Sequence, residues 1–157
     1  MKRYAAGSVH GRFQPLHKGH LEYLLKAKRH CDFLFVGITQ CDNQTLLDSP
    51  EAPHRRETEN NPMTYEERVD MITRVLMDEG LGSNEFAVIP FPIETPERLK
   101  NYLPTTVPIF TTVYDDWNRH KIKVLRENGY KVIILWKRSN KKYDGTGRTD
   151  RTKIGRR

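Results

Sequence analysis

Hydrophobic positions along the chain alternate between short continuous runs and segments with helical spacing. The runs predict five buried strands, at Tyr4–Val9, Phe33–Ile38, Phe86–Phe91, Val107–Val113 and Val132–Trp136. The helical spacing predicts helices between them, at Leu16–His30, Thr64–Glu79, Pro96–Leu103 and Trp117–Asn128. Because strands that alternate with helices form right-handed βαβ units, the sequence predicts an α/β fold, a Rossmann-like doubly wound sheet of five parallel strands.

Signals at helix ends support two of these helices. Thr64 is a good N-cap, and Glu67 three residues later completes a capping box. The last helix ends before Gly129, which suits the left-handed C′ position. The polar segment 39–62 is long for a loop in a compact domain, and such loops are usually functional or disordered.

Length and composition restrict the class of protein. The chain has 157 residues, of which 30% are charged and 36% hydrophobic, so we expect one folded domain. Its apolar runs are far shorter than the ~20 residues that cross a bilayer, and its N-terminus lacks the apolar stretch of a secretory signal. Two cysteines do not make a disulfide framework. We therefore expect a cytoplasmic protein with no membrane partner.

The net charge of +7 is concentrated at the end of the chain. Residues 137–157 hold nine Lys or Arg and two Asp, so residues 1–136 are neutral overall. We interpret 1–136 as the folded domain and 137–157 as a basic tail, either a phosphate-binding turn or a linker to a further domain. Because a basic tail alone is more often solvated than a recognition surface, nucleic acid is not the expected partner.

The segment after the first predicted strand carries the chemistry. It reads Gly-Arg-Phe-Gln-Pro-Leu-His-Lys-Gly-His over residues 11–20, and doubly wound sheets bind ligands beyond the carboxyl ends of their strands. His17 and His20 are three residues apart near a helix start, so they share one face. Gly19 leaves room for a close anion, and the helix N-terminus adds N–H groups and a positive dipole. The combination predicts a polyphosphate site for phosphoryl or nucleotidyl transfer, in which catalysis is mainly charge stabilisation and positioning.

The histidine pair has two other interpretations. Histidines at this spacing bind zinc in some proteins, but no third ligand lies nearby in a metalloprotease pattern, so no protein-held metal is predicted. The spacing is also compatible with ordinary surface histidines, since it is a weak signal alone. The preceding strand, the turn and the central glycine favour the phosphate site.

This segment resembles the signature of the HxGH nucleotidyltransferase superfamily. Residues 61–68, Asn-Pro-Met-Thr-Tyr-Glu-Glu-Arg, resemble a second block found in archaeal-type nicotinamide mononucleotide (NMN) adenylyltransferases, and the likeness covers about residues 4–136. The resemblance implies transfer of a nucleoside monophosphate from a nucleoside triphosphate, with release of pyrophosphate. It also implies that His17 and His20 contact the triphosphate and the transition state. Mg²⁺ is the expected cofactor, bridging the phosphates with mostly water ligands.

Residues 114–117, Tyr-Asp-Asp-Trp, follow the fourth predicted strand. Asp115 and Asp116 suit ribose hydroxyls, and Trp117 suits stacking on a base. An equally weighted interpretation makes Asp116 the N-cap of the next helix and Trp117 a packed side chain. The block resembles the Gly-Asp-Asp-Trp block of glycerol-3-phosphate cytidylyltransferases, with Tyr114 in place of the glycine, and this resemblance favours CTP over ATP.

The superfamily also has a Ser/Thr-rich turn after the fifth strand, which ends in Arg and holds the β- and γ-phosphates. The tail offers Thr146 and Arg148, but Thr149 then stands where the motif has Arg. A register on Thr152 places Gly155 there instead. Either the motif has diverged, or the tail is a linker.

Three functions are compatible with these observations. The whole pattern resembles the cytidylyltransferase domain of the bifunctional fosfomycin-pathway enzyme. That resemblance implies antibiotic biosynthesis, fusion to a further domain, and CMP transfer from CTP to 2-hydroxyethylphosphonate or a similar small phosphate or phosphonate. The alternative within the same class is NMN adenylylation with ATP. The alternative from another class is a non-catalytic nucleotide or nucleic-acid binding module, supported independently by the basic tail alone.

The predicted site residues fall into three groups. The catalytic residues are His17 and His20. The nucleotide-binding residues are Gly11, Arg12, Phe13, Gly19, Asp115, Asp116, Trp117, Thr146 and Arg148. The acceptor-binding residues, by location and resemblance, are Gln14, Thr39, Gln40, Tyr65 and Arg68. Lys18, Arg68 and one tail arginine are also predicted phosphate contacts, and His10 either lines the site or packs in the core.

Overall fold

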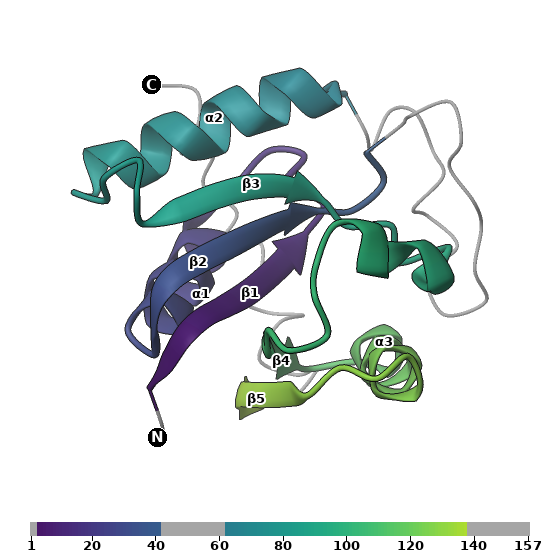
Figure 1. Ribbon diagram of the computed structural model, residues 1–157. Coiled ribbons are helices and arrows are strands. Elements are labelled where there is room, and N and C mark those ends of the chain that lie inside the picture. Colours follow the sequence, from purple (N-terminus) through teal and green to yellow (C-terminus); the bar gives the residue numbers. More distant parts are fainter. Residues whose placement is uncertain (1–2, 42–61, 138–157) are drawn as a thin grey trace.

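The computed structural model describes residues 3–41 and 62–137 (Figure 1). Within these residues, five parallel strands form one sheet in the order β3-β2-β1-β4-β5. The strands are β1 (Tyr4–Gly11), β2 (Cys31–Ile38), β3 (Phe86–Pro90), β4 (Ile109–Val113) and β5 (Val132–Lys137). The helices are α1 (Lys18–Lys28), α2 (Tyr65–Asp78), the 3₁₀ helix η4 (Pro96–Asn101) and α3 (Asp116–Glu127). The predicted Rossmann-like α/β sheet is confirmed.

Helices pack against the sheet through two separate hydrophobic clusters. Leu34 and Val36 of β2 belong to the cluster that contains α1 and α2. Phe35, between them, packs on the cluster that contains η4 and α3. Because successive side chains of a strand point to opposite faces, α1 and α2 cover one face and η4 and α3 cover the other. The crossovers change face between β1 and β4, so the carboxyl ends of these two strands form the switch point at which such sheets bind ligands.

Several element ends confirm the sequence prediction. Thr64 is the N-cap of α2, and it forms the predicted capping box with Glu67. Asn128 is the C-cap of α3, and Gly129 after it has a φ of +91°. That left-handed conformation is the one a glycine adopts at no steric cost.

Other element ends differ from the prediction for local reasons. α1 begins at Lys18 and not at Leu16, because His17 has an extended backbone and caps the helix. β4 begins at Ile109 and not at Val107, directly after a proline that has no N–H for the sheet. The predicted helix at Pro96–Leu103 is a shorter 3₁₀ helix that ends at Asn101.

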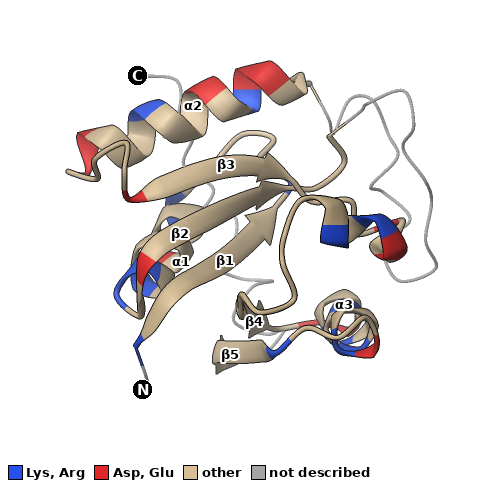
Figure 2. Cartoon of the chain, in the orientation of Figure 1, with Lys and Arg blue, Asp and Glu red and all other residues tan. Residues whose placement is uncertain are grey.

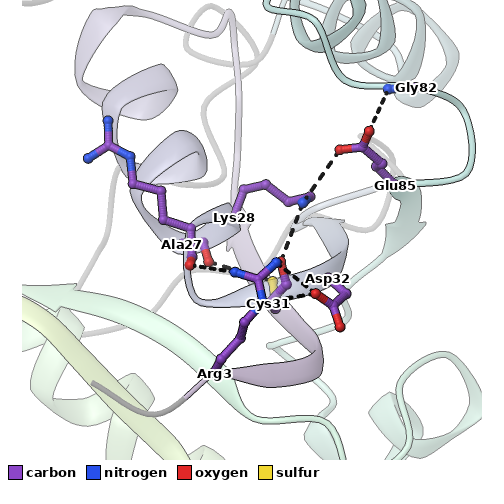
Figure 3. Close-up of polar contacts among 8 residues, drawn as sticks. Arg3, Ala27, Lys28, Cys31, Asp32, Gly82 and Glu85 are labelled. Carbon is purple, nitrogen blue, oxygen red and sulfur yellow. Dashed lines mark hydrogen bonds and ion pairs between the residues drawn. The ribbon is translucent and has the colours of Figure 1, made fainter.

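Polar side chains join neighbouring segments at the amino-terminal ends of β1 and β2, away from the switch point (Figure 3). Arg3 Nη2 lies 2.6 Å from Asp32 Oδ1, and both side chains are exposed. Lys28 Nζ lies 3.5 Å from Glu85 Oε2 and donates to the Cys31 carbonyl at 3.3 Å. Exposed ion pairs contribute about 0–1 kcal/mol each, so the pair of Arg3 and Asp32 is a minor support of the fold.

Charged side chains lie mainly on the helices and loops, while the strands carry few of them (Figure 2). This distribution is typical of a sheet covered on both faces. In the described part of the chain, no helix is both long enough and apolar enough to cross a membrane.

Candidate active site

His17 and His20 hold each other at the start of α1. His17 Nδ1 accepts a hydrogen bond from the His20 backbone N–H at 3.3 Å, and His20 Nδ1 accepts from the His17 backbone N–H at 3.2 Å. The two rings stack with their centroids 3.6 Å apart. Because Nδ1 accepts in both rings, this arrangement assigns the proton of each neutral imidazole to Nε2. The pair thus offers two Nε2–H donors beside the positive end of a helix, where an anion is favoured.

A side chain at position 19 would crowd the His17 ring. A Cβ on Gly19 would lie 3.1 Å from Cε1 and 3.2 Å from Nδ1 of His17. These contacts are tighter than most real Cβ contacts, so a side chain there would push on the stacked imidazole. The sequence prediction related Gly19 to the approach of an anion, and the structure adds that Gly19 leaves space for His17 itself.

Phe13 packs against His20. Its side chain is fully buried, and its ring meets the His20 ring edge-on with centroids 4.9 Å apart. A Cβ on Gly11 would lie 2.9 Å from the Phe13 ring, so Gly11 leaves space for that ring. Because the Phe13 ring has no exposed surface, a ligand does not contact it. The predicted nucleotide contact at Phe13 is therefore corrected for its side chain.

Gln14 connects the histidine segment to the second sequence block. Its Oε1 accepts from the Met63 backbone N–H at 2.8 Å, and its Nε2 donates to the Met63 carbonyl at 3.1 Å. Both ends of the amide are thus engaged by one backbone residue just before α2. The sequence predicts an acceptor contact for Gln14, whereas in the structure its amide binds Met63 and holds the start of α2 beside the turn after β1.

Arg68 is buried and binds backbone carbonyls from three segments. Its Nη1 donates to Arg12 O at 3.1 Å and to Thr39 O at 2.9 Å, and its Nη2 donates to Gln40 O at 2.8 Å. Its Nε also donates to Thr64 O at 3.2 Å, and burial lowers the pKa of the guanidinium. The predicted phosphate or acceptor contact by Arg68 is therefore corrected, because its donors hold the turn after β1, the end of β2 and the start of α2 together. Its partners are carbonyls, which every residue has, so no residue pattern could reveal this role.

Thr39 and Gln40 follow the carboxyl end of β2. Their exposed fractions are 2% and 5%. Within the described residues, the Thr39 hydroxyl and the Gln40 amide oxygen and nitrogen have no hydrogen-bond partner. Gln40 also has a φ of +49°, in the left-handed region that residues other than glycine rarely adopt. Strained, unsatisfied polar residues of this kind concentrate at functional sites.

Two further side chains border the carboxyl ends of β1 and β2. His10 is 4% exposed and stacks on Phe91, with ring centroids 4.4 Å apart and an interplanar angle of 3°. The packed interpretation of His10 thus fits the structure. Tyr65, the first residue of α2, is half-buried, and burial raises the pKa of its hydroxyl above its ordinary value.

The Tyr-Asp-Asp-Trp block starts α3 beyond β4. Asp115 is the N-cap, and its Oδ1 accepts from the Asn118 N–H at 2.8 Å. The predicted cap was Asp116, but Asp116 is the first helical residue, its side chain is 93% exposed and it pairs with Arg119. The cap prediction is therefore wrong by one residue. Trp117 packs partly on the second hydrophobic cluster and stacks on His120, with centroids 5.8 Å apart.

Arg12, half-buried, and Lys18, exposed, flank the histidine segment. The predicted tail residues Thr146 and Arg148 lie outside the described residues. Over residues 3–41 and 62–137, no group of three or more His, Cys, Asp or Glu side chains is arranged to hold a metal ion.

A family model decides the class of protein. The model for cytidylyltransferase-like proteins matches residues 9–142, which include the histidine pair, the end of β2, α2 and α3. The chain belongs to the cytidylyltransferase-like family. This membership confirms the predicted nucleotidyltransferase relationship, and the chain is a nucleotidyltransferase, with cytidylyl transfer favoured.

Curated relatives agree with this family. A phosphonoformate cytidylyltransferase of Streptomyces viridochromogenes is 41% identical over 146 residues, which are 93% of this chain and 79% of that protein. A nicotinamide-nucleotide adenylyltransferase of Saccharolobus solfataricus is 32% identical over 141 residues, 89% of this chain and 74% of that protein.

Solved structures support the fold. A bifunctional NMN adenylyltransferase/ADP ribose pyrophosphatase of Francisella tularensis superimposes with a TM-score of 0.57 at 19% sequence identity. The match covers 86% of this chain and 38% of that chain, so this chain spans well under half the length of that protein. At this identity the likeness concerns the fold alone.

Proposed function

We propose that the protein transfers CMP from CTP to a small phosphonate and releases pyrophosphate. The observation that carries the proposal is the 41% identity to phosphonoformate cytidylyltransferase across 93% of the chain. The paired imidazole donors at the start of α1 support it, because nucleotidyl transfer needs preorganised donors where negative charge develops. The proposal includes a cytoplasmic location, since CTP is a cytoplasmic substrate. Fusion to a further domain and a place in antibiotic biosynthesis stay predictions.

The proposed reaction is an in-line displacement at phosphorus. A phosphonate oxygen attacks the α-phosphorus of CTP and forms a new P–O bond. The bond between the α-phosphorus and its bridging oxygen breaks, and pyrophosphate leaves with that electron pair. Negative charge grows on the α-phosphate oxygens and on the leaving group, so hydrogen-bond donors fixed beforehand lower the barrier.

We assign the charge stabilisation to His17 and His20. Their Nε2–H groups point away from the backbone atoms that hold Nδ1, so both are donors to phosphate oxygens. Lys18 is exposed at the first turn of α1 and adds positive charge beside them. Mg²⁺ is proposed as part of the CTP substrate, bound mainly to phosphate oxygens and water, and it would neutralise the charge of the triphosphate.

Nucleotide recognition is assigned to the switch point. Asp116 and Trp117 begin α3 just beyond β4, the neighbour of β1. The carboxylate of Asp116 is exposed and suits ribose hydroxyls, and Trp117 presents a partly exposed ring beside it. Asp115 caps the helix and orients both residues.

NMN adenylylation with ATP is the second proposal. It is supported by the 32% identity to the adenylyltransferase of Saccharolobus solfataricus. The lower identity makes it less favoured than CMP transfer to a phosphonate.

Pyrophosphate release tests both proposals directly. The full chain is incubated with Mg²⁺ and either CTP or ATP, each with 2-hydroxyethylphosphonate, phosphonoformate or NMN. Release with CTP and a phosphonate is expected, and a CMP-phosphonate product is then identified by ³¹P NMR. Release with ATP and NMN alone would replace the first proposal by the second. CTP binding without release in any mixture would instead favour a binding module.

A further inference from the structure

β1 and β4 pair over a short stretch only. Within the described residues, β1 pairs with β2 along its length, but it pairs with β4 only at Ser8 and Ile109. The Ser8 N–H donates to Pro108 O at 2.9 Å. The hydrogen bonds of a parallel ladder are evenly spaced and recur with every second residue, so the next bond would join the His10 N–H to Phe110 O.

The Tyr23 hydroxyl takes the place of that next hydrogen bond. The His10 N–H donates to the Tyr23 hydroxyl at 3.3 Å, and the hydroxyl donates to Phe110 O at 2.5 Å. Its two partners are thus the donor and the acceptor that the ladder would join directly. Because an oxygen atom stands between them, the strands are farther apart here than a direct hydrogen bond of about 2.9 Å would hold them.

Tyr23 reaches the two strands from the second turn of α1. It lies three residues after His20, so the two side chains share one face of the helix. Its side chain is buried in the hydrophobic cluster that contains α1 and α2. The hydroxyl therefore joins the helix that begins with the histidine pair to β1 and to β4 at once.

The two strands lead to different parts of the proposed nucleotide site. β1 continues into the turn before His17, and β4 continues into the start of α3, where Asp116 and Trp117 lie. Beyond Ser8 and Ile109, the described residues contain no further pairing of β1 with β4. The Tyr23 hydroxyl is thus placed to fix the distance between the strands where they approach the site.

We propose that Tyr23 is a positioning residue that sets the separation between the histidine pair, assigned to the phosphates, and the start of α3, assigned to the nucleoside. The inference rests on the proposed function, which supplies both assignments. A nucleoside triphosphate spans the two parts, so its binding and its reaction depend on the separation between them. A ligand that fills one part alone does not depend on that separation.

Tyr23→Phe tests the inference because it removes the hydroxyl and keeps the buried ring. Calorimetry in the presence of Mg²⁺ measures the Kd of CTP, of cytidine and of inorganic tripolyphosphate. Pyrophosphate release measures kcat with the acceptor that the wild-type protein uses best. We expect the Kd of CTP to rise and kcat to fall, each by roughly tenfold, since a small misplacement of reacting groups is costly. The Kd values of cytidine and of tripolyphosphate should each change by less than about twofold, because each ligand fills one part.

Tyr130→Phe is the matched control. The Tyr130 side chain is buried, and its hydroxyl also donates to a backbone carbonyl, that of Leu103, at 2.5 Å. Tyr130 lies just before β5, at the amino-terminal side of the sheet. Both variants lose a buried hydroxyl and some stability with it, which thermal melting measures. At a temperature at which both are folded, only Tyr23→Phe should change the Kd of CTP and kcat.

Amide hydrogen exchange in the wild-type protein tests the inference without a variant, and it decides the question if Tyr23→Phe does not fold. Coupling is reciprocal, so if the hydroxyl bridge strengthens CTP binding, CTP must stabilise the bridge. Exchange of the His10 N–H should therefore be slower with CTP than with a saturating mixture of cytidine and tripolyphosphate.

The outcomes separate this inference from the proposed function. If the wild-type protein does not transfer CMP from CTP, the proposed function fails and the inference fails with it. If CTP is used but Tyr23→Phe and Tyr130→Phe have the same Kd for CTP and the same kcat, the inference alone is overturned. Equal weakening of CTP, cytidine and tripolyphosphate also overturns it, because Tyr23 would then support each part separately. Equal exchange of the His10 N–H in the two ligand states has the same consequence.

Discussion

His17 and His20 each accept a hydrogen bond on Nδ1 from the other's backbone N–H, at 3.3 and 3.2 Å, while their rings stack at 3.6 Å. The contacts form a capping box made of two imidazoles instead of the usual Ser or Thr with Glu. The pair thus starts the helix and at the same time fixes which ring nitrogen faces outward. Stability and catalysis share these residues, and experiments must separate the two effects.

His17→Asn and His17→Ala separate capping from catalysis. Asn is a good N-cap and Ala is not, so the Ala variant should lose about 1 kcal/mol more stability than the Asn variant. Both variants lack the Nε2–H donor, so both should lose roughly 10²–10³-fold in kcat. Urea unfolding and pyrophosphate release measure the two effects. Near-normal turnover in His17→Asn would exclude a direct role of the imidazole.

Arg68→Met should destabilise the protein strongly. The change leaves the carbonyls of Arg12, Thr39 and Gln40 without this donor, at an expected loss of about 2–4 kcal/mol in the free energy of unfolding. Arg74→Met on the same helix is the matched control, because the Arg74 side chain is 67% exposed and its ion pair with Asp70 is a surface pair. Chemical denaturation of both variants measures the difference.

Arg68→Lys tests the positioning role at a temperature at which the variant is folded. A lysine ammonium cannot reach the separate carbonyls as a planar fork does. We expect KM for the acceptor to rise more than KM for CTP, because the end of β2 loses its support. Equal changes in both constants would mean that Arg68 serves global stability alone.

Asp115→Ala and Asp116→Ala should have opposite profiles. Asp115 accepts from the Asn118 N–H, so removing it should cost about 1 kcal/mol of stability. The Asp116 side chain is 93% exposed, so its loss should change stability far less and instead raise KM for CTP. Thermal melting and initial rates measure the two properties. If Asp116→Ala leaves KM for CTP unchanged, the ribose contact is excluded and the block serves only to begin α3.

Tyr23→Phe should change the stability of the protein at alkaline pH. The buried Tyr23 hydroxyl donates to Phe110 O at 2.5 Å and accepts from the His10 N–H at 3.3 Å. Burial raises the pKa of Tyr23 above its ordinary value of 10.0, so the folded state keeps a proton that the unfolded state loses. The stability that depends on this proton is complete below pH 10.0 and declines as the pH rises above it.

The comparison uses urea unfolding at neutral and at alkaline pH. At neutral pH the variant should be about 1–3 kcal/mol less stable, because two buried backbone groups lose their partner. Above pH 10.0 its stability should decline less steeply than that of the wild-type protein. Parallel declines in the two proteins would show that Tyr23 does not cause the alkaline loss.

Local patterns were enough to predict most of the fold. Buried strands such as β2 appear as continuous apolar runs, and the capping box of Thr64 and Glu67 marks the start of α2 by residue type alone. The prediction of the cap at Asp116 failed by one residue, because both aspartates suit an N-cap and only the backbone conformation at Asp115 decides between them. The histidine pair was predictable because its chemistry depends on a short spacing.

The sequence by itself determined the order of strands and helices, the nucleotidyltransferase signature and the family, since these depend on residue types at short separations. The tertiary structure decided which groups Gln14 and Arg68 bind. Gln14 binds the backbone of Met63, and Arg68 binds carbonyls that are distant along the chain. Every residue has a backbone carbonyl, and every residue except proline has a backbone N–H. Such partners therefore cannot be recognised from residue types in the sequence. Only folding brings them within hydrogen-bond distance and shows which polar side chains are already engaged.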